Sequence, residues 1–306
     1  MTPWTSIPEP VRNAIECRTG PVNQAEDITT GRNNDLATVL NRTGRSAVFV
    51  KGVRGISHRM RWLRNEITSE RLTAGLAPKV LFHADVEADD DWLVVGFEFV
   101  PGRPADLSPG SPDLPLVATA LEELSTRPAL DAKPLRRRWS VTNWWGKLAD
   151  EYPDQTAGWD VELLDAWNRL APGKVDGDRL LHTDLHPEHF RIAPNGSTRI
   201  IDWSWPASGA AWTDSAYLVI RLMDEGHSAA DAESWARSLE CFSGADDEAL
   251  NAFAAHVSGL WTYRAATGAV PPGLAEVART YATWRLRAAE SSGSEAARPT
   301  RSTTSR

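Results

Sequence analysis

The stretch HTDLHPEH, residues 182–189, is the densest group of titratable side chains in the chain, and RIIDW, residues 199–203, follows it closely. A Pro-Asn-Gly turn signal separates the two stretches. This order predicts a loop, a short strand, a tight turn and a second short strand that ends in a carboxylate. Such a hairpin brings Asp184, His189 and Asp202 near one another.

Two carboxylates at the edge of a cleft can bind a divalent metal ion and can take a proton from a hydroxyl group. A second interpretation starts from the histidines, because residues 182–189 also read as H-x-D-x-H-x-x-H, which could be a zinc site of a metal-dependent hydrolase. The order differs from the H-x-H-x-D-H of metallo-β-lactamases. Pro187 also argues against a helix-borne ligand pair such as H-E-x-x-H.

The chain before residue 101 has the pattern of a small antiparallel sheet with helices. Helical spacing is expected at Val11–Arg18 and Ser57–Ala74, and β-rich runs are expected at Asp35–Leu40, Ser46–Gly52, Lys79–Ala84 and Trp92–Val100. We therefore expect a first lobe over residues 1–100.

Residues 101–115 are rich in Pro, Gly and Ser and are expected to form a linker. Residues 116–290 are expected to form a mostly helical lobe, and residues 291–306 a disordered tail. The expected helices are Leu116–Ser125, Val141–Asp150, Val161–Leu170, Ser215–Glu225, Ala229–Cys241, Glu248–Ala266 and Gly273–Ala289. Asp214 and Ser228 are candidate N-caps.

The composition excludes several classes of protein. The net charge of −8 argues against non-specific nucleic-acid binding and against a polybasic membrane anchor. Two cysteines are too few for a disulfide framework, which favours a reducing cytoplasm. From the N-terminal residues we expect no secretory leader, and no segment approaches the roughly 20 apolar residues of a membrane span.

The pattern HxDLHPxx followed by IIDW closely resembles the catalytic segment of the aminoglycoside phosphotransferase family, whose members are relatives of protein kinases. The resemblance spans roughly residues 25–217, with further matching segments upstream. Ala47–Lys51 resembles the family's third strand, which carries a phosphate-contacting lysine, and Asn65-Glu66 lies where the family has the helix with that lysine's partner. Gly31–Asn34 lies where the family has its phosphate-covering loop, although it lacks a GxGxxG. Gly96–Gly102 resembles the hinge between the lobes.

This resemblance implies a bilobal, protein-kinase-like α+β fold and the transfer of the γ-phosphoryl group of ATP, or of GTP, with Mg²⁺ (magnesium). Asp184 is then the group that orients and deprotonates the acceptor hydroxyl, and Asp202 is the ligand of Mg²⁺. Lys51 would hold the α- and β-phosphates, and Glu66 would fix Lys51. The expected nucleotide contacts also include Gly31, Asn33 and Asn34 at the phosphates, and the backbone of Glu98, Phe99 and Val100 at the adenine.

His189 departs from the family pattern, which has Asn five residues after the catalytic Asp as a second metal ligand. A neutral imidazole suits Mg²⁺ less well than an amide oxygen does. Three outcomes stay open: His189 binds a metal, one metal suffices, or phosphoryl transfer is impaired. The last outcome corresponds to a non-catalytic pseudokinase that only binds nucleotide.

The acceptor is expected to be a hydroxylated small molecule, such as an aminoglycoside, another antibiotic or a metabolite, and a role in antibiotic resistance follows only by resemblance. An aminoglycoside would need carboxylates in the helical lobe, where Asp160, Glu162 and Glu225 are candidates. The run Arg136–Arg138 could attract an anionic substrate or could be a solvated surface run. Asp214 fits either an N-cap or the family position that supports the catalytic loop. The sequence predicts no oligomeric state.

Overall fold

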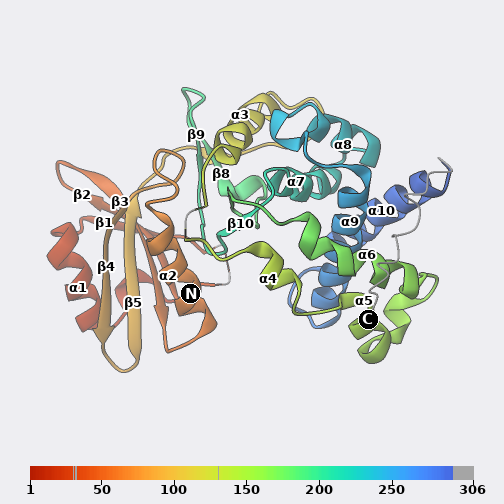
Figure 1. The fold of residues 1–306 in the computed structure, drawn as a ribbon. Coiled ribbons are helices and arrows are strands. Elements are labelled where there is room, and N and C mark those ends of the chain that lie inside the picture. Colours follow the sequence, from red (N-terminus) through yellow and green to blue (C-terminus); the bar gives the residue numbers. More distant parts are fainter. Residues whose placement is uncertain (30, 32, 130, 292–306) are drawn as a thin grey trace. The chain divides into compact units, whose positions relative to one another are not determined.

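The computed structural model describes residues 1–29, 31, 33–129 and 131–291, and Figure 1 labels most of its helices and strands. The chain divides into two compact units. The first comprises Met1–Ala105 together with Glu188–Pro206, and the second comprises Asp106–Pro187 together with the chain from Ala207 onward. The prediction had assigned residues 188–206 to the helical lobe, but they pack with the first unit. Except for Ser291, the predicted tail lies outside the described residues.

The first unit contains a five-stranded antiparallel sheet in the order β1-β2-β3-β5-β4. Its strands are β1 (Gln24–Asp27), β2 (Leu36–Arg42), β3 (Arg45–Arg54), β4 (Val80–Glu87) and β5 (Asp91–Glu98). All four strands predicted from the sequence are present, and β1 is an addition at the sheet edge. The four residues QAED of β1 are mostly exposed and carry no hydrophobic pattern, so the sequence did not reveal it.

Two helices cover opposite faces of this sheet because side chains alternate along each strand. On one face, α1 (Glu9–Thr19) packs against a core that includes Val48 and Val50 of β3. On the other face, α2 (His58–Ser69) packs against Val53 and Leu93. Lys51 shares the period of Val53 and therefore points toward α2.

A smaller sheet carries the predicted hairpin of the first unit. It consists of β6 (Arg103–Pro104), β8 (Phe190–Ile192) and β9 (Thr198–Ile200), and the turn between β8 and β9 lies where the sequence predicted it. The expected linker 101–115 is therefore partly structured, because β6 pairs with β8. The amide of Ile201 donates to the carbonyl of His189 at 2.9 Å, which fixes the residue before Asp202 beside the loop.

The second unit is mostly helical, as expected (Figure 1). Its helices are α3 (Leu114–Ser125), α4 (Leu135–Trp139), α5 (Trp144–Glu151), α6 (Val161–Lys174), α7 (Thr213–Asp224), α8 (Ala229–Arg237), α9 (Asp247–Ala266) and α10 (Pro272–Ser291), and β7 (Arg179–Leu181) pairs with β10 (Ala207–Gly209). The short helix α4 was not predicted, because its sequence LRRRW is dominated by charge.

The N-cap predictions had different outcomes. Ser228 caps α8, since its side chain accepts a hydrogen bond from the amide of Asp231. Asp214 does not cap α7, because Trp212 occupies that position and Asp214 lies inside the first turn. No helix in the described part of the chain is long and apolar enough to cross a bilayer.

Candidate active site

Lys51 lies at the centre of a buried group of charges in the first unit. Its Nζ lies 2.9 Å from both carboxylate oxygens of Glu66 and 3.2 Å from Oδ2 of Asp202. β3 directs the lysine toward α2, and Glu66 is on the inner face of that helix. The side chains of Lys51 and Glu66 are only 8% and 7% exposed, whereas Asp202 is 32% exposed. The two carboxylates therefore share one ammonium group, and Asp202 is the one that solvent reaches.

Burial and charge act against each other in this group. Burial alone would lower the pKa of Lys51, but the charges of Asp202 and Glu66 outweigh it and hold that pKa above its ordinary value. Burial raises the pKa of Glu66 to about 7, although Lys51 acts to lower it. For Asp202, burial acts upward, but the Lys51 and His189 charges and the hydrogen bonds hold its pKa well below the usual range. At neutral pH Asp202 is therefore ionised, whereas Glu66 titrates close to neutrality.

The backbone around Asp202 is unusual and locally braced. Asp202 has a φ of +66°, a left-handed conformation that non-glycine residues seldom adopt. The hydroxyl of Ser204 donates to Oδ1 of Asp202 at 2.7 Å, and the amide of Asn65 donates to the carbonyl of Ser204 at 2.9 Å. Asn65 and Ser204 therefore position the carboxylate. The sequence identified neither role, and the only available signal was a hydroxyl two residues after Asp202.

His189 is buried, and its Nε2 lies 3.9 Å from Oδ2 of Asp202. The sequence prediction that His189 and Asp202 come together therefore agrees with the geometry. As a donor set for a cation, the Asp202 carboxylate fits Mg²⁺, which prefers oxygen. The imidazole of His189 is a softer donor that suits Mn²⁺ or Zn²⁺ better. The pair fits a divalent ion through Asp202 first and His189 second.

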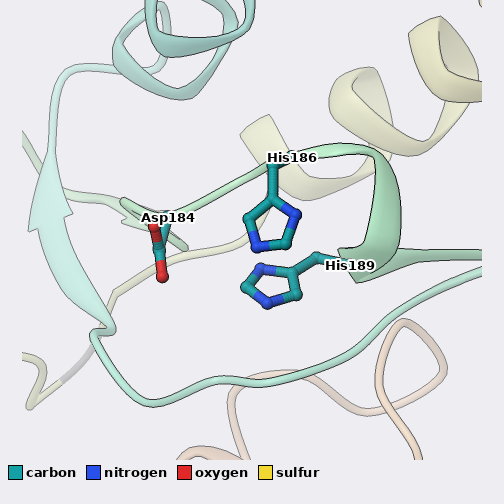
Figure 2. Close-up of side chains that lie close together, drawn as sticks. All are labelled: Asp184, His186 and His189. Carbon is teal, nitrogen blue, oxygen red and sulfur yellow. The ribbon is translucent and has the colours of Figure 1, made fainter. Parts of the chain in front are cut away.

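The loop before β8 holds a further set of metal-binding side chains. Asp184, His186 and His189 extend from this one loop toward a common point (Figure 2), and their nearest ligand atoms all lie within 4.8 Å of one another. One carboxylate oxygen and two imidazole nitrogens suit zinc better than magnesium. The geometry thus retains the donors that the hydrolase interpretation requires.

In the second unit, Asp214 supports the loop that carries Asp184. Its two carboxylate oxygens accept hydrogen bonds from the amides of His182 at 2.7 Å and Thr183 at 2.8 Å. Burial raises the pKa of Asp214 to about 6, because the two amides only partly compensate for lost hydration. Asp214 therefore supports the backbone of this loop and is not the N-cap of α7.

The same loop holds a second left-handed residue. Thr183 has a φ of +64°, and among the described residues only Thr183 and Asp202 combine a positive φ with a side chain. Strain of this kind is concentrated at functional sites, because surrounding contacts must hold it in place. His182 contributes to this support, since its buried Nδ1 accepts from the amide of Asp184 at 3.3 Å.

The remaining predicted nucleotide contacts lie at the borders of the sheet. Gly31, with a φ of +101°, and Asn33 are exposed in the β1–β2 turn, and Asn34 is half-buried beside them. Glu98 ends β5, where its amide donates to the carbonyl of Lys79 at 2.8 Å. Phe99 and Val100 follow outside the strand. The first three residues thus lie in the connection between β1 and β2, and the other three lie at the end of β5 and just after it.

The comparisons identify proteins with a related fold. A model of the phosphotransferase enzyme family matches residues 37–253. The ternary complex of a thermostable mutant of aminoglycoside phosphotransferase APH(4)-Ia with ADP and hygromycin B has a TM-score of 0.64 at 13% identity, covering 90% of this chain and 97% of that one. No curated protein sequence matches.

Two other solved structures match over similar lengths. Choline kinase LicA from Streptococcus pneumoniae has a TM-score of 0.59 at 16% identity, covering 91% of this chain and 98% of that one. The GDP complex of a mutant of an aminoglycoside phosphotransferase of type IIIa has a TM-score of 0.61 at 17% identity, covering 93% and 97%. The predicted kinase-like α+β fold is therefore confirmed.

Proposed function

Because the chain belongs to the phosphotransferase enzyme family, we propose that it transfers the γ-phosphoryl group of ATP to a hydroxyl group of a small molecule. The observation that carries this proposal is the Lys51–Glu66–Asp202 group of the first unit. A buried lysine held between two carboxylates, one of them partly exposed, is the arrangement that phosphate binding beside a divalent cation requires. The nucleotides in neighbouring structures are consistent with it.

Each residue of this group has a distinct role in the proposal. Lys51 binds the α- and β-phosphates, and Glu66 keeps the ammonium group in place. Asp202 would hold Mg²⁺, which would supply charge neutralisation at the phosphates. Ser204 and Asn65 hold Asp202 in its left-handed conformation. Nucleotide entry would break the Lys51–Asp202 ion pair and leave the Lys51–Glu66 pair intact.

Asp184 is the proposed catalytic residue of the second unit. Its carboxylate accepts the proton of the acceptor hydroxyl while the hydroxyl oxygen forms a bond to the γ-phosphorus and the bond to the β-phosphate oxygen breaks. ADP leaves with that electron pair. Asp214 and His182 position the loop through the backbone contacts described above.

The nucleotide base and phosphates would be held by backbone groups. Since the amide of Glu98 is committed to Lys79, the following residues Phe99 and Val100 are the ones to contact the adenine or guanine ring. The β1–β2 turn with Gly31 would cover the phosphates. The proposal places this chemistry in the cytoplasm, in line with the two free cysteines, Cys17 and Cys241.

Phosphorus-31 NMR of the protein with ATP, Mg²⁺ and a pool of hydroxylated acceptors tests the proposal. We expect a new phosphomonoester resonance with equimolar ADP, and neither in Asp184→Asn. Hydrolysis of an ester or amide in the presence of zinc, without consumption of ATP, would instead support the hydrolase built on Asp184, His186 and His189. Nucleotide binding without any phosphomonoester would support the pseudokinase.

A further inference from the structure

One arginine of the second unit contacts the loop that carries Asp184, and two more lie on helices that aromatic contacts connect to the helix of the first. Arg138 is on α4, Arg221 on α7 and Arg264 on α9. Nη1 of Arg138 donates a hydrogen bond to the hydroxyl of Thr183 at 3.0 Å, so this guanidinium reaches the residue adjacent to Asp184. Arg138 and Arg264 are exposed over part of their side chains and Arg221 is half-buried, so a solute can reach part of each side chain.

A set of buried aromatic rings links the three helices beneath these arginines. Trp139 of α4 contacts Tyr217 of α7 edge-on at 6.4 Å between ring centroids, and Tyr217 lies 6.1 Å from Trp261 of α9. The guanidinium carbon of Arg221 lies 5.2 Å from the Trp261 ring centroid. The rings therefore hold the helices together at the point where the arginines emerge.

Asp214, Tyr217 and Arg221 are spaced at i, i+3 and i+7, so they share one face of α7. Asp214 holds the catalytic loop, which places Arg221 on the side of the helix that this loop occupies. Charge interactions agree with that placement. Burial lowers the pKa of Arg221, although the charges of Asp184, Asp224 and Glu225 act to raise it.

The charges of Arg138 and Arg264 also act on each other. Burial lowers the pKa of Arg138, the proximity of Tyr217 acts to raise it, and the positive charge of Arg264 lowers it further. Like charges brought together repel unless an anion lies between them. Within the described part of the chain, neither Arg221 nor Arg264 has a carboxylate within 4.0 Å, whereas Arg136 on the same helix as Arg138 pairs with Asp176 at 3.2 Å.

The carboxylates that a cationic acceptor would need serve other purposes or lie elsewhere. Asp160 caps α6, since its side chain accepts from the amide of Leu163 at 3.0 Å. Glu162 follows in the first turn of the same helix. Glu225 is exposed at the end of α7, near Arg221.

We propose that the acceptor carries an anionic group, a carboxylate or a phosphate, which Arg138, Arg221 and Arg264 bind while its hydroxyl faces Asp184. This inference rests on the proposed function, because it names the acceptor class of the same site. Guanidinium groups bind both anions through charge-assisted, often bidentate hydrogen bonds. Within the run Arg136–Arg138, Arg136 thus forms a surface ion pair, whereas Arg138 is a side chain that would bind the acceptor.

Four probes that share one sugar ring test the charge preference: glucuronate, glucose 6-phosphate, glucose and glucosamine. Binding is followed by the intrinsic fluorescence of the tryptophans, with ATP binding measured in parallel by calorimetry. We expect at least one of the two anions to bind about tenfold tighter than glucose, with glucosamine weakest. The carboxylate and phosphate arms distinguish which anion the site prefers.

The variants locate the effect. Arg221→Gln and Arg138→Gln should each weaken anion binding about tenfold to hundredfold, and Arg136→Gln, which removes only a surface pair, should leave it unchanged. Anions that bind no better than glucose and glucosamine, or equal losses in all three variants, would overturn the inference. If anions bind as expected and ATP does not, the anion site stands and the phosphotransferase proposal fails. If ATP binds and the anions do not, only the acceptor inference fails.

Discussion

Replacing Lys51 by methionine should destabilise the first unit far more than the loss of one surface charge would. The side chain is 8% exposed and contacts two carboxylates, so Lys51→Met leaves Glu66 buried at 7% exposure beside Asp202 with no compensating cation. Breaking a buried ion pair by removing one partner costs about 3–5 kcal/mol, and most of that cost is the uncompensated charge that remains. Asp202 contributes less, because it is 32% exposed and can be hydrated.

A double-mutant cycle in urea isolates this cause. Glu66→Gln in the Lys51→Met background removes the buried charge, so the double variant should be about 1–3 kcal/mol more stable than Lys51→Met alone. The penalty of Lys51→Met should also be smaller at about pH 6 than at about pH 8, because without the lysine Glu66 takes up a proton more readily. Lys79 is exposed, so Lys79→Met should change the free energy of unfolding by less than about 0.5 kcal/mol.

Two results would refute this reasoning. A cost of less than about 1 kcal/mol for Lys51→Met would show that the ion pair is solvated and not buried. If Glu66→Gln lowered the free energy of unfolding as much in Lys51→Met as in the wild type, the two residues would be acting independently. Either result would remove the structural basis for treating Lys51 as a pre-positioned phosphate ligand.

Burial lowers the pKa of His256 to about 3, so below about pH 6.5 the unfolded chain takes up a proton that the folded chain does not. The free energy of unfolding should therefore fall by about 2 kcal/mol between about pH 7 and pH 5. In urea titrations, His256→Gln should remove this part of the pH dependence. His189→Asn replaces a nitrogen donor by an amide oxygen, so ATP binding should need a lower Mg²⁺ concentration. Any preference of the wild type for Mn²⁺ over Mg²⁺ should become smaller in this variant. An unchanged dependence of ATP binding on Mg²⁺ and on Mn²⁺ would show that His189 binds no metal. Ser204→Ala removes the hydrogen bond to Asp202, and we expect the Mg²⁺ enhancement of ATP binding to weaken severalfold in calorimetry, whereas an unaltered enhancement would show that Ser204 does not position the carboxylate.

The sequence predicted the parts of the fold that have a clear period or a strong turn signal. Side chains alternate along β3, so Lys51 lies on the other face of the sheet from Val48 and Val50, and this follows from strand geometry alone. The turn before β9 and the cap at Ser228 also follow from local chemistry. The β1 strand could not be predicted, because its pairing with β2 depends on backbone hydrogen bonds and its side chains are mostly exposed.

The site was predictable where residue type determines chemistry and unpredictable where long-range packing does. The selection of Asp184 and Asp202 as site residues follows from the polar stretches 182–189 and 199–203. The contact of Glu66 with Lys51 follows from the family resemblance. The role of Asp214 could not be separated from capping, because only the fold brings its carboxylate to the amides of His182 and Thr183. Arg138 was indistinguishable from Arg136 in sequence, and only their partners differ.

Calorimetric titration of ATP into the protein with and without Mg²⁺, in the wild type and in Asp202→Ala, tests whether Lys51 and Asp202 form a nucleotide and metal site. We expect that ATP binds, that Mg²⁺ strengthens the binding, and that Asp202→Ala loses this strengthening. GTP titrated in the same way shows which nucleotide is preferred. If neither ATP nor GTP bound, with Mg²⁺ or without it, the proposed nucleotide site would be wrong.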